Sequence, residues 1–186
     1  MGNSFLSRRA GSLAASLSVL LLASCEATPS GLSAEDPLLS RSGVPTRSHG
    51  DLLRAVRQET SRFNSTTQAI RAGYQADTHC VAVPGLGGMG YHWVNEGLID
   101  PVFDPMRPEV LLYGTGPGGN LRLIGVEYIV INVGQPHPSF DGHPFDVGGV
   151  PPLMAAGIPH WSLHVWIHEV NPNGLFTPFN PNVSCP

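Results

Sequence analysis

Lysine is absent from this 186-residue chain, and charged residues of all kinds make up only 13% of it. All ten basic residues are therefore arginines, and after position 72 only Arg107 and Arg122 remain against nine carboxylates. A protein that binds nucleic acid needs a basic surface to meet the phosphates. The main body of this chain is acidic instead, so we expect no nucleic-acid partner.

A hydrophobic run long enough to span a bilayer is also missing. The run from Leu13 to Leu22 is shorter than the roughly 20 residues that a membrane-spanning helix needs. Arg8 and Arg9 precede it, and it ends in the sequence Leu-Ala-Ser-Cys at residues 22–25, which resembles the lipobox of bacterial lipoprotein precursors. We predict a signal peptide over residues 1–24 and a lipid on Cys25. An ordinary signal peptide with an incidental cysteine is the alternative.

Residues 25–49 contain Pro, Ser, Gly and Thr without apolar periodicity, which is typical of a flexible tether. A coil of this length reaches roughly 25–30 Å from end to end. Glu26 is not the aspartate that retains lipoproteins in the inner membrane of some Gram-negative bacteria. We therefore expect a protein of the bacterial cell envelope, anchored to the membrane through Cys25, in the outer membrane and facing the periplasm or the cell surface.

Cysteine is scarce, with three in the chain. If Cys25 carries a lipid, Cys80 and Cys185 remain as an even pair in an oxidising compartment, where disulfides persist. We predict that these two form a disulfide that fastens the C-terminal tail to the start of the folded body. A cysteine metal ligand is the weaker alternative, because neither cysteine has a second one at ligand spacing.

The remaining sequence predicts one α+β domain over residues 50–186. Residues 51–72 show apolar spacings of three and four, which indicates a single amphipathic helix that ends at Gly73. Short apolar runs at 89–94, 109–113, 121–133 and 161–170 predict strands, with a hairpin connection at 116–120. We expect the helix to pack on a mainly antiparallel sheet or partial barrel, with a long Gly/Pro-rich loop over residues 134–159.

Glu127 is a lone carboxylate within the apolar run 121–133. A period of two places Glu127 on the same face as Leu123 and Ile129, with Val126 and Tyr128 on the opposite face. Both faces are apolar, so Glu127 is predicted to be buried. A buried carboxylate has to be paired, bound to a metal or protonated. The predicted partner must come from another strand.

Histidines in two other predicted strands are the natural partners. His160, His164 and His168 recur every four residues, but their neighbours favour a strand, on which they lie about 13 Å apart and cannot share one ion. His164 is central in its run, and His92 is similarly embedded in residues 90–94. We predict that His92, Glu127 and His164 converge from three adjacent strands.

This set has two interpretations. Two histidines and a carboxylate suit zinc, iron or manganese, with Glu127 as a ligand or general base. The same residues would also satisfy one another as a buried hydrogen-bonded cluster. Loop residues His137, Asp141 and His143 are candidates for a further ligand.

Two classes of function remain open, and the sequence does not decide whether the protein is an enzyme. One is an envelope domain that binds a divalent transition metal. The other is a non-catalytic structural or interaction domain that binds a partner through an aromatic surface around Trp93, Trp161 and Trp166. No protein or small-molecule partner is specified by either pattern.

Several segments together resemble an uncharacterised family of bacterial secreted and lipid-anchored proteins. The resemblance covers nearly all of the chain after the tether, and it implies the envelope location but no activity, ligand or cofactor. The segments that carry it are Gly88 to Asn95, Leu121 to Tyr128, Leu163 to Trp166, Asn171 to Gly174 and Asn180 to Cys185.

Overall fold

The computed structural model of the chain describes residues 49–186. The signal peptide predicted for residues 1–24, the predicted lipid site at Cys25 and nearly all of the predicted tether therefore lie outside the described residues. Within residues 49–186, no helix is both long enough and apolar enough to cross a bilayer.

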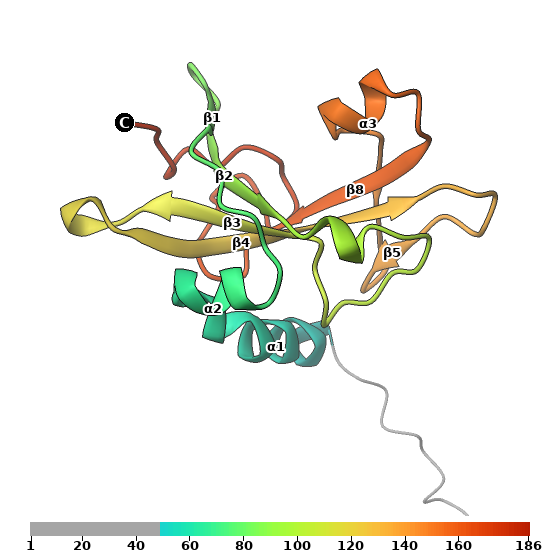
Figure 1. Ribbon diagram of the computed structural model, residues 1–186, viewed down its shortest axis with the longest axis horizontal. Helices are drawn as coiled ribbons and strands as arrows, with labels where there is room; N and C mark the ends of the chain where they lie inside the picture. Colours follow the sequence, from blue (N-terminus) through green and yellow to red (C-terminus); the bar gives the residue numbers. More distant parts are fainter. Residues whose placement is uncertain (1–48) are drawn as a thin grey trace, which may run out of the picture. The chain divides into compact units, whose positions relative to one another are not determined.

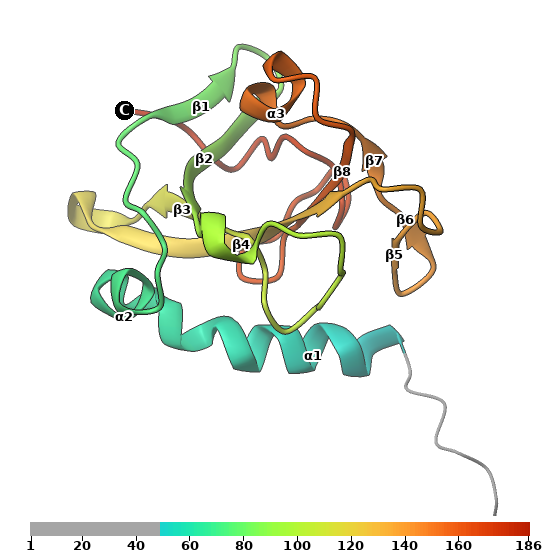
Figure 2. The same cartoon turned by 45° about the vertical axis from the view of Figure 1, so that its right-hand side comes forward.

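A six-stranded antiparallel sheet forms the centre of the fold, in the order β1-β2-β3-β4-β8-β7. The sheet curls into a half-barrel, which is seen best in Figure 2. Two very short strands, β5 and β6, pair separately. The bounds are β1 Cys80–Val83, β2 Gly87–Val94, β3 Val110–Thr115, β4 Leu121–Ile131, β5 Ser139–Phe140, β6 His143–Pro144, β7 Asp146–Val147 and β8 His160–Val165.

The expected α+β class is confirmed, with the helices divided between the two sides of the sheet (Figure 1). The N-terminal helices α1 (His49–Thr60) and α2 (Thr66–Arg71) lie on one side, and the short helix α3 (Pro151–Ala155) lies on the other. Three single turns of 3-10 helix complete the structure, at Ser61–Asn64, Glu96–Leu98 and Pro117–Gly119. The last of these forms the hairpin predicted between the second and third long strands, β3 and β4.

The prediction of a single helix over residues 51–72 is wrong in its middle, because residues 61–65 interrupt the helix and separate α1 from α2. Ser61 and Asn64 bond to nearby backbone carbonyls, which competes with the helical ladder. The carbonyl of Phe63 accepts a hydrogen bond from the buried Tyr113 hydroxyl at 2.6 Å. This bond ties the break to the sheet. The predicted stop is confirmed, because Gly73 follows α2 with a φ of +99°.

The two faces of the sheet have separate apolar cores. The face toward α1 and α2 contributes Trp93, Tyr113, Tyr128 and Leu163 to the larger core. The opposite face contributes Val110 and other residues to a smaller core, against α3 and the C-terminal segment. Members of the smaller core include Leu112, Ile124, Ile129, Trp166, Val183 and the partly buried Leu153.

A bulge in β4 changes which residues of that strand share a face, so the predicted faces need correction. Gly125 pairs with Leu112 and Leu123 pairs with Tyr113, so Ile124 is the extra residue between them. The extra residue reverses the alternation. Leu123 consequently packs in the larger core, on the face opposite Glu127, although strict alternation placed the two together.

Two other sequence expectations need correction. The strand predicted over 161–170 ends at Val165, because the chain then turns across β4, where His168 and Glu169 donate backbone hydrogen bonds to the Ile124 carbonyl. The predicted long loop 134–159 contains β5, β6, β7 and α3.

The C-terminal segment is fastened to β2 by backbone contacts. Gly88 and Asn180 exchange two backbone hydrogen bonds of 3.1 and 3.0 Å. Gly87 beside them has a φ of +98°, and a Cβ at this position would lie 2.2 Å from the Asn180 carbonyl oxygen. Only glycine permits this approach. The predicted disulfide between Cys80 and Cys185 is also present and completes the attachment.

The disulfide is expected to contribute substantially to stability. It joins residues 105 positions apart, and closing such a loop restricts the unfolded chain by at most ~5 kcal/mol. Replacing both Cys80 and Cys185 by Ser should lower the free energy of unfolding by about 2–4 kcal/mol. Urea denaturation of both proteins measures this change. A loss below about 1 kcal/mol would show that backbone contacts alone hold the segment.

Candidate metal centre

Strand register brings two of the three predicted site residues together. Glu127 of β4 lies directly opposite His164 of β8. On the other side of β4, Glu127 pairs with Val110 of β3, which pairs in turn with Val94 of β2. His92 precedes Val94 by two residues, so it lies on the same face of the sheet. This face belongs to the smaller core.

The three residues converge, but not from adjacent strands as predicted. β3 lies between β2 and β4, so the His92 side chain reaches the site across β3. A flat sheet would leave His92 and Glu127 two strand spacings apart, about 10 Å. The curl of the half-barrel closes this distance, and β2 is visibly bent upward from β4 in Figure 2.

The facing atoms form a nearly regular triangle. The His92 and His164 Nε2 atoms are 3.4 Å apart. The Glu127 Oε2 atom lies 3.8 Å from His92 Nε2 and 3.9 Å from His164 Nε2. The point in their plane that is equidistant from the three atoms lies about 2.1–2.2 Å from each, which is close to zinc–nitrogen and zinc–oxygen bond lengths of about 2.0–2.2 Å.

Hydrogen bonds within the triangle would require shorter distances. A typical N–H···O bond measures about 2.7–3.2 Å. Both distances to Glu127 are well beyond that range, and the distance between the imidazoles is at its outer limit. The three groups therefore point at a common centre without bonding well to one another.

Two of the three side chains are buried more deeply than the third. The side chains of Glu127 and His164 are 6% and 8% exposed, whereas that of His92 is 19% exposed. Solvent therefore has its access at the His92 edge.

Burial keeps all three groups uncharged at neutral pH in the absence of a cation. It raises the pKa of Glu127 to about 8, and the buried carboxyl of Glu109 contributes to this rise. Burial, with a smaller contribution from His92, lowers the pKa of His164 to about 3. The pKa of His92 falls to about 4 for the same principal reason, burial. Two neutral imidazoles are the form that binds a metal.

Neighbouring groups orient the candidate ligands. The His92 ring makes a hydrogen bond to the backbone of Gly90, and metal-binding histidines ordinarily use their second nitrogen in this way. The Ser162 hydroxyl donates to the Gly148 carbonyl at 2.8 Å and also lies within hydrogen-bonding reach of Glu127. Ser162 is thus placed to hold the carboxyl in position.

Glu109 is a second buried carboxyl, and the sequence reasoning missed it. Its side chain accepts a hydrogen bond from the Ile129 backbone N–H at 2.9 Å. Burial raises the pKa of Glu109 to about 8, partly opposed by this bond. The signal was available, since Glu109 begins the apolar run that includes Val110.

The other candidate residues lie elsewhere. Among residues 49–186, the cluster of His92, Glu127 and His164 is the only group of three or more such side chains with the spacing of a metal site. His137 stacks on Trp161, and His143 stacks on Phe176. Asp141 does not join the cluster either.

The tryptophans predicted to form an exposed aromatic surface are buried. Trp93, Trp161 and Trp166 are only 3–6% exposed. Aromatic residues do cluster in this structure, but within the larger core, where Phe103 packs on the rings of Tyr128 and Phe145. The prediction of an exposed aromatic surface at the three tryptophans is therefore wrong.

Comparison with known proteins adds no further identification, because no protein-family model, curated protein or solved structure matches the chain.

Replacing Glu127 by Gln should stabilise the metal-free protein at high pH. With a folded pKa of about 8 and an ordinary value of 4.5, the carboxyl favours the folded state below pH 4.5. This contribution is lost as the pH rises through 8, by up to about 1.4 kcal/mol per pH unit. Urea denaturation in EDTA at pH 5 and pH 8 should therefore show the E127Q variant gaining stability relative to the native protein at pH 8.

The matched control is Glu109→Gln, since its carboxyl has a similarly raised pKa of about 8. Both variants should flatten the pH dependence of unfolding, but only E127Q should reduce metal binding. Equal losses of metal binding would contradict the assignment of Glu127 to the site.

Proposed function

We propose that this chain is a metal-binding domain of the bacterial cell envelope, which holds one divalent transition metal ion between His92, Glu127 and His164. Zinc, iron and manganese are the candidates, because each accepts two imidazoles and a carboxylate. The lipid predicted on Cys25 would anchor the domain to the membrane.

The spacing of the triangle carries this proposal. Distances of 3.4, 3.8 and 3.9 Å are too long for a well-bonded polar cluster and suit ligands around a shared ion. Without a cation, burial keeps Glu127 protonated, because its charged form is costly in an apolar core. A cation at the centre removes this cost.

The charge and burial of the site support the same conclusion. Two neutral imidazoles and one carboxylate leave a divalent ion with a single net positive charge. Three protein ligands leave at least one coordination position for water or a substrate, on the more exposed side near His92. A metal bound in this way polarises a water or carbonyl oxygen. We assign the binding site and not a reaction.

The competing proposal is a structural or interaction domain in which the His–Glu–His cluster only fills the core. It depended on an exposed aromatic surface at the three tryptophans, and these are buried. It also depended on mutual hydrogen bonds, which the distances to Glu127 do not permit. The buried tryptophans and the long distances to Glu127 therefore favour metal binding over this alternative.

Elemental analysis tests the proposed site. Protein exported to the periplasm and purified without chelators should contain about one zinc, iron or manganese ion per chain. His164→Ala should remove most of this metal, because His164 supplies one of three ligands. Restoring the metal to stripped native protein at 100 times its dissociation constant should raise the free energy of unfolding by about 2.7 kcal/mol.

His143→Ala is the matched control for this experiment, because His143 is exposed and lies outside the cluster. It should retain the metal content of the native protein. A native protein that carries no metal, and whose unfolding does not respond to any of the three ions, would refute the proposal.

Cell fractionation tests the lipid anchor separately. Cys25→Ser removes the thiol that would carry the lipid. The variant should therefore be found in the soluble fraction and not in the membrane fraction that detergent extracts. Ser24→Ala, one residue earlier, keeps a small residue at the predicted cleavage site and should preserve membrane association. If the C25S protein stays in the membrane fraction to the same extent, the predicted lipid anchor is wrong.

A further inference from the structure

A pocket separate from the metal centre lies between α1 and the segment after β8. Its volume is about 280 Å³, just below the range of roughly 300–1,000 Å³ of ordinary small-molecule sites. Four of its six lining residues are apolar and two are arginines of α1. The lining residues are Leu53, Arg54, Arg57, Trp166, Ile167 and Leu175.

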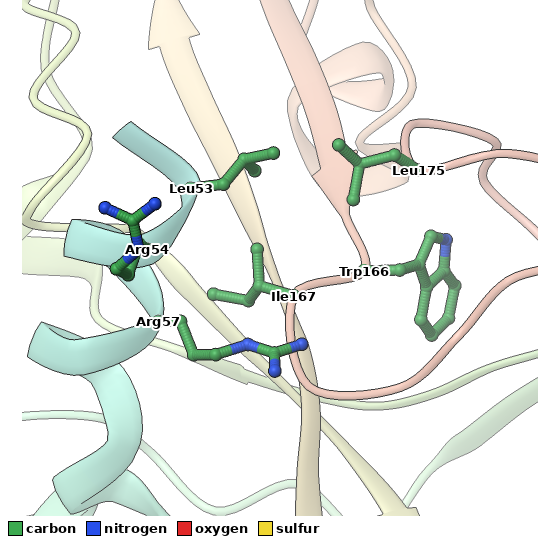
Figure 3. Close-up of a pocket in the computed structure, with 6 residues that line it drawn as sticks. All are labelled: Leu53, Arg54, Arg57, Trp166, Ile167 and Leu175. Carbon is green, nitrogen blue, oxygen red and sulfur yellow. The ribbon is translucent and has the colours of Figure 1, made fainter. Parts of the chain in front are cut away.

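Apolar side chains form facing walls of this pocket (Figure 3). Leu53 of α1 and Leu175 of the C-terminal segment point toward each other, and Ile167 points toward α1. All three are partly or fully buried against the larger core. They offer a surface for a short hydrocarbon group, which gains free energy from leaving water.

The two arginines differ in their surroundings. Arg54 turns away from the apolar walls in Figure 3, and it pairs with Asp51 at 2.7 Å. Arg57 extends past Ile167 and makes no ion pair within the part of the chain that the structure describes. The guanidinium group of Arg57 is thus available for an anion at the end of the apolar walls.

Among residues 49–186, the second arginine of the pocket, Arg54, is paired with Asp51, and no carboxylate pairs with Arg57. His168 lies near Arg57 and its Nε2 atom is 2.9 Å from the Thr60 hydroxyl. Burial, together with the charge of Arg57, lowers the pKa of His168 to about 4, so this imidazole is neutral at neutral pH. The charge of Arg57 is therefore not compensated by its neighbours.

We infer that this pocket binds a small anionic amphiphile, a single carboxylate or phosphate group on a short unbranched apolar chain. The head group accepts hydrogen bonds from Arg57, and the chain lies against Leu53, Ile167 and Leu175. A planar guanidinium group suits either head group, because it donates two parallel hydrogen bonds. A volume of about 280 Å³ suits one short chain.

Calorimetric titration with sodium octanoate below its micelle concentration tests this inference. The measurement uses the full chain with Cys25→Ser, which should be soluble without detergent. Octanoate should bind, and Arg57→Gln should weaken it about tenfold, because a charge-assisted hydrogen bond is lost. Arg57→Lys should recover part of the affinity, since the charge is retained without the paired donors.

Arg71→Gln is the matched control, because Arg71 is an exposed helical arginine of α2 that does not line the pocket. It should bind octanoate as the native protein does. Octyltrimethylammonium, which has a cationic head, should not bind. Backbone amide shifts in NMR spectra should locate the octanoate at Leu53, Ile167 and Leu175.

Three results would overturn the inference. One is equal affinity of octanoate for the native protein and R57Q. Another is a loss of octanoate affinity in R71Q that equals the loss in R57Q, which would indicate nonspecific attraction. The third is binding to vesicles that contain phosphatidylglycerol without binding to free octanoate. That result would assign the arginines to a membrane surface. None of these measurements depends on metal at His92, Glu127 and His164.

Discussion

A carboxyl group within the smaller apolar core is the constraint on which the arrangement of this sheet depends. Leaving Glu127 charged and unpartnered there would cost several kcal/mol, comparable with much of the stability of an ordinary domain. Imidazoles from β2 and β8 are directed at it, and the Ser162 hydroxyl lies beside it. The imidazoles stand too far away for good hydrogen bonds, which is why the triangle is better explained by ligation than by packing.

The curl of the sheet makes this triangle possible. Register alone joins Glu127 to His164, but His92 reaches the centre only because β2 bends over β3. The bent end of β2 is held by the C-terminal segment, through the bonds between Gly88 and Asn180. The disulfide adds a second attachment, since Cys80 is paired with Tyr91, the residue before His92. The attachment of the C-terminal segment therefore also holds β2 in the position that brings His92 to the site.

The sequence predicted the parts of the fold that depend on local pattern. The runs containing His92, Glu127 and His164 were recognisable as strands, and the isolation of Glu127 in an apolar run indicated that it needed partners. The interruption of the helix near Phe63 has local signals in Ser61 and Asn64, but the Tyr113 hydroxyl that ties it to the sheet comes from 50 residues away. The bulge at Ile124 was missed for a similar reason, since strand pairing decides where an extra residue is accommodated. The curl that brings β2 to the site is likewise a property of the whole sheet.

Glu109 and Glu127 show which property distinguishes a binding site from a structural carboxyl. Both side chains are buried, and burial raises both pKa values to about 8. Glu109 accepts a backbone hydrogen bond of 2.9 Å, and that bond satisfies it within the sheet. Glu127 instead faces two imidazoles at 3.8 and 3.9 Å, and all three groups surround one point. A raised pKa is therefore not evidence of function by itself, because a structural carboxyl shows the same shift. The distinguishing property is that several donor atoms converge at metal–ligand distances from a centre that none of them occupies.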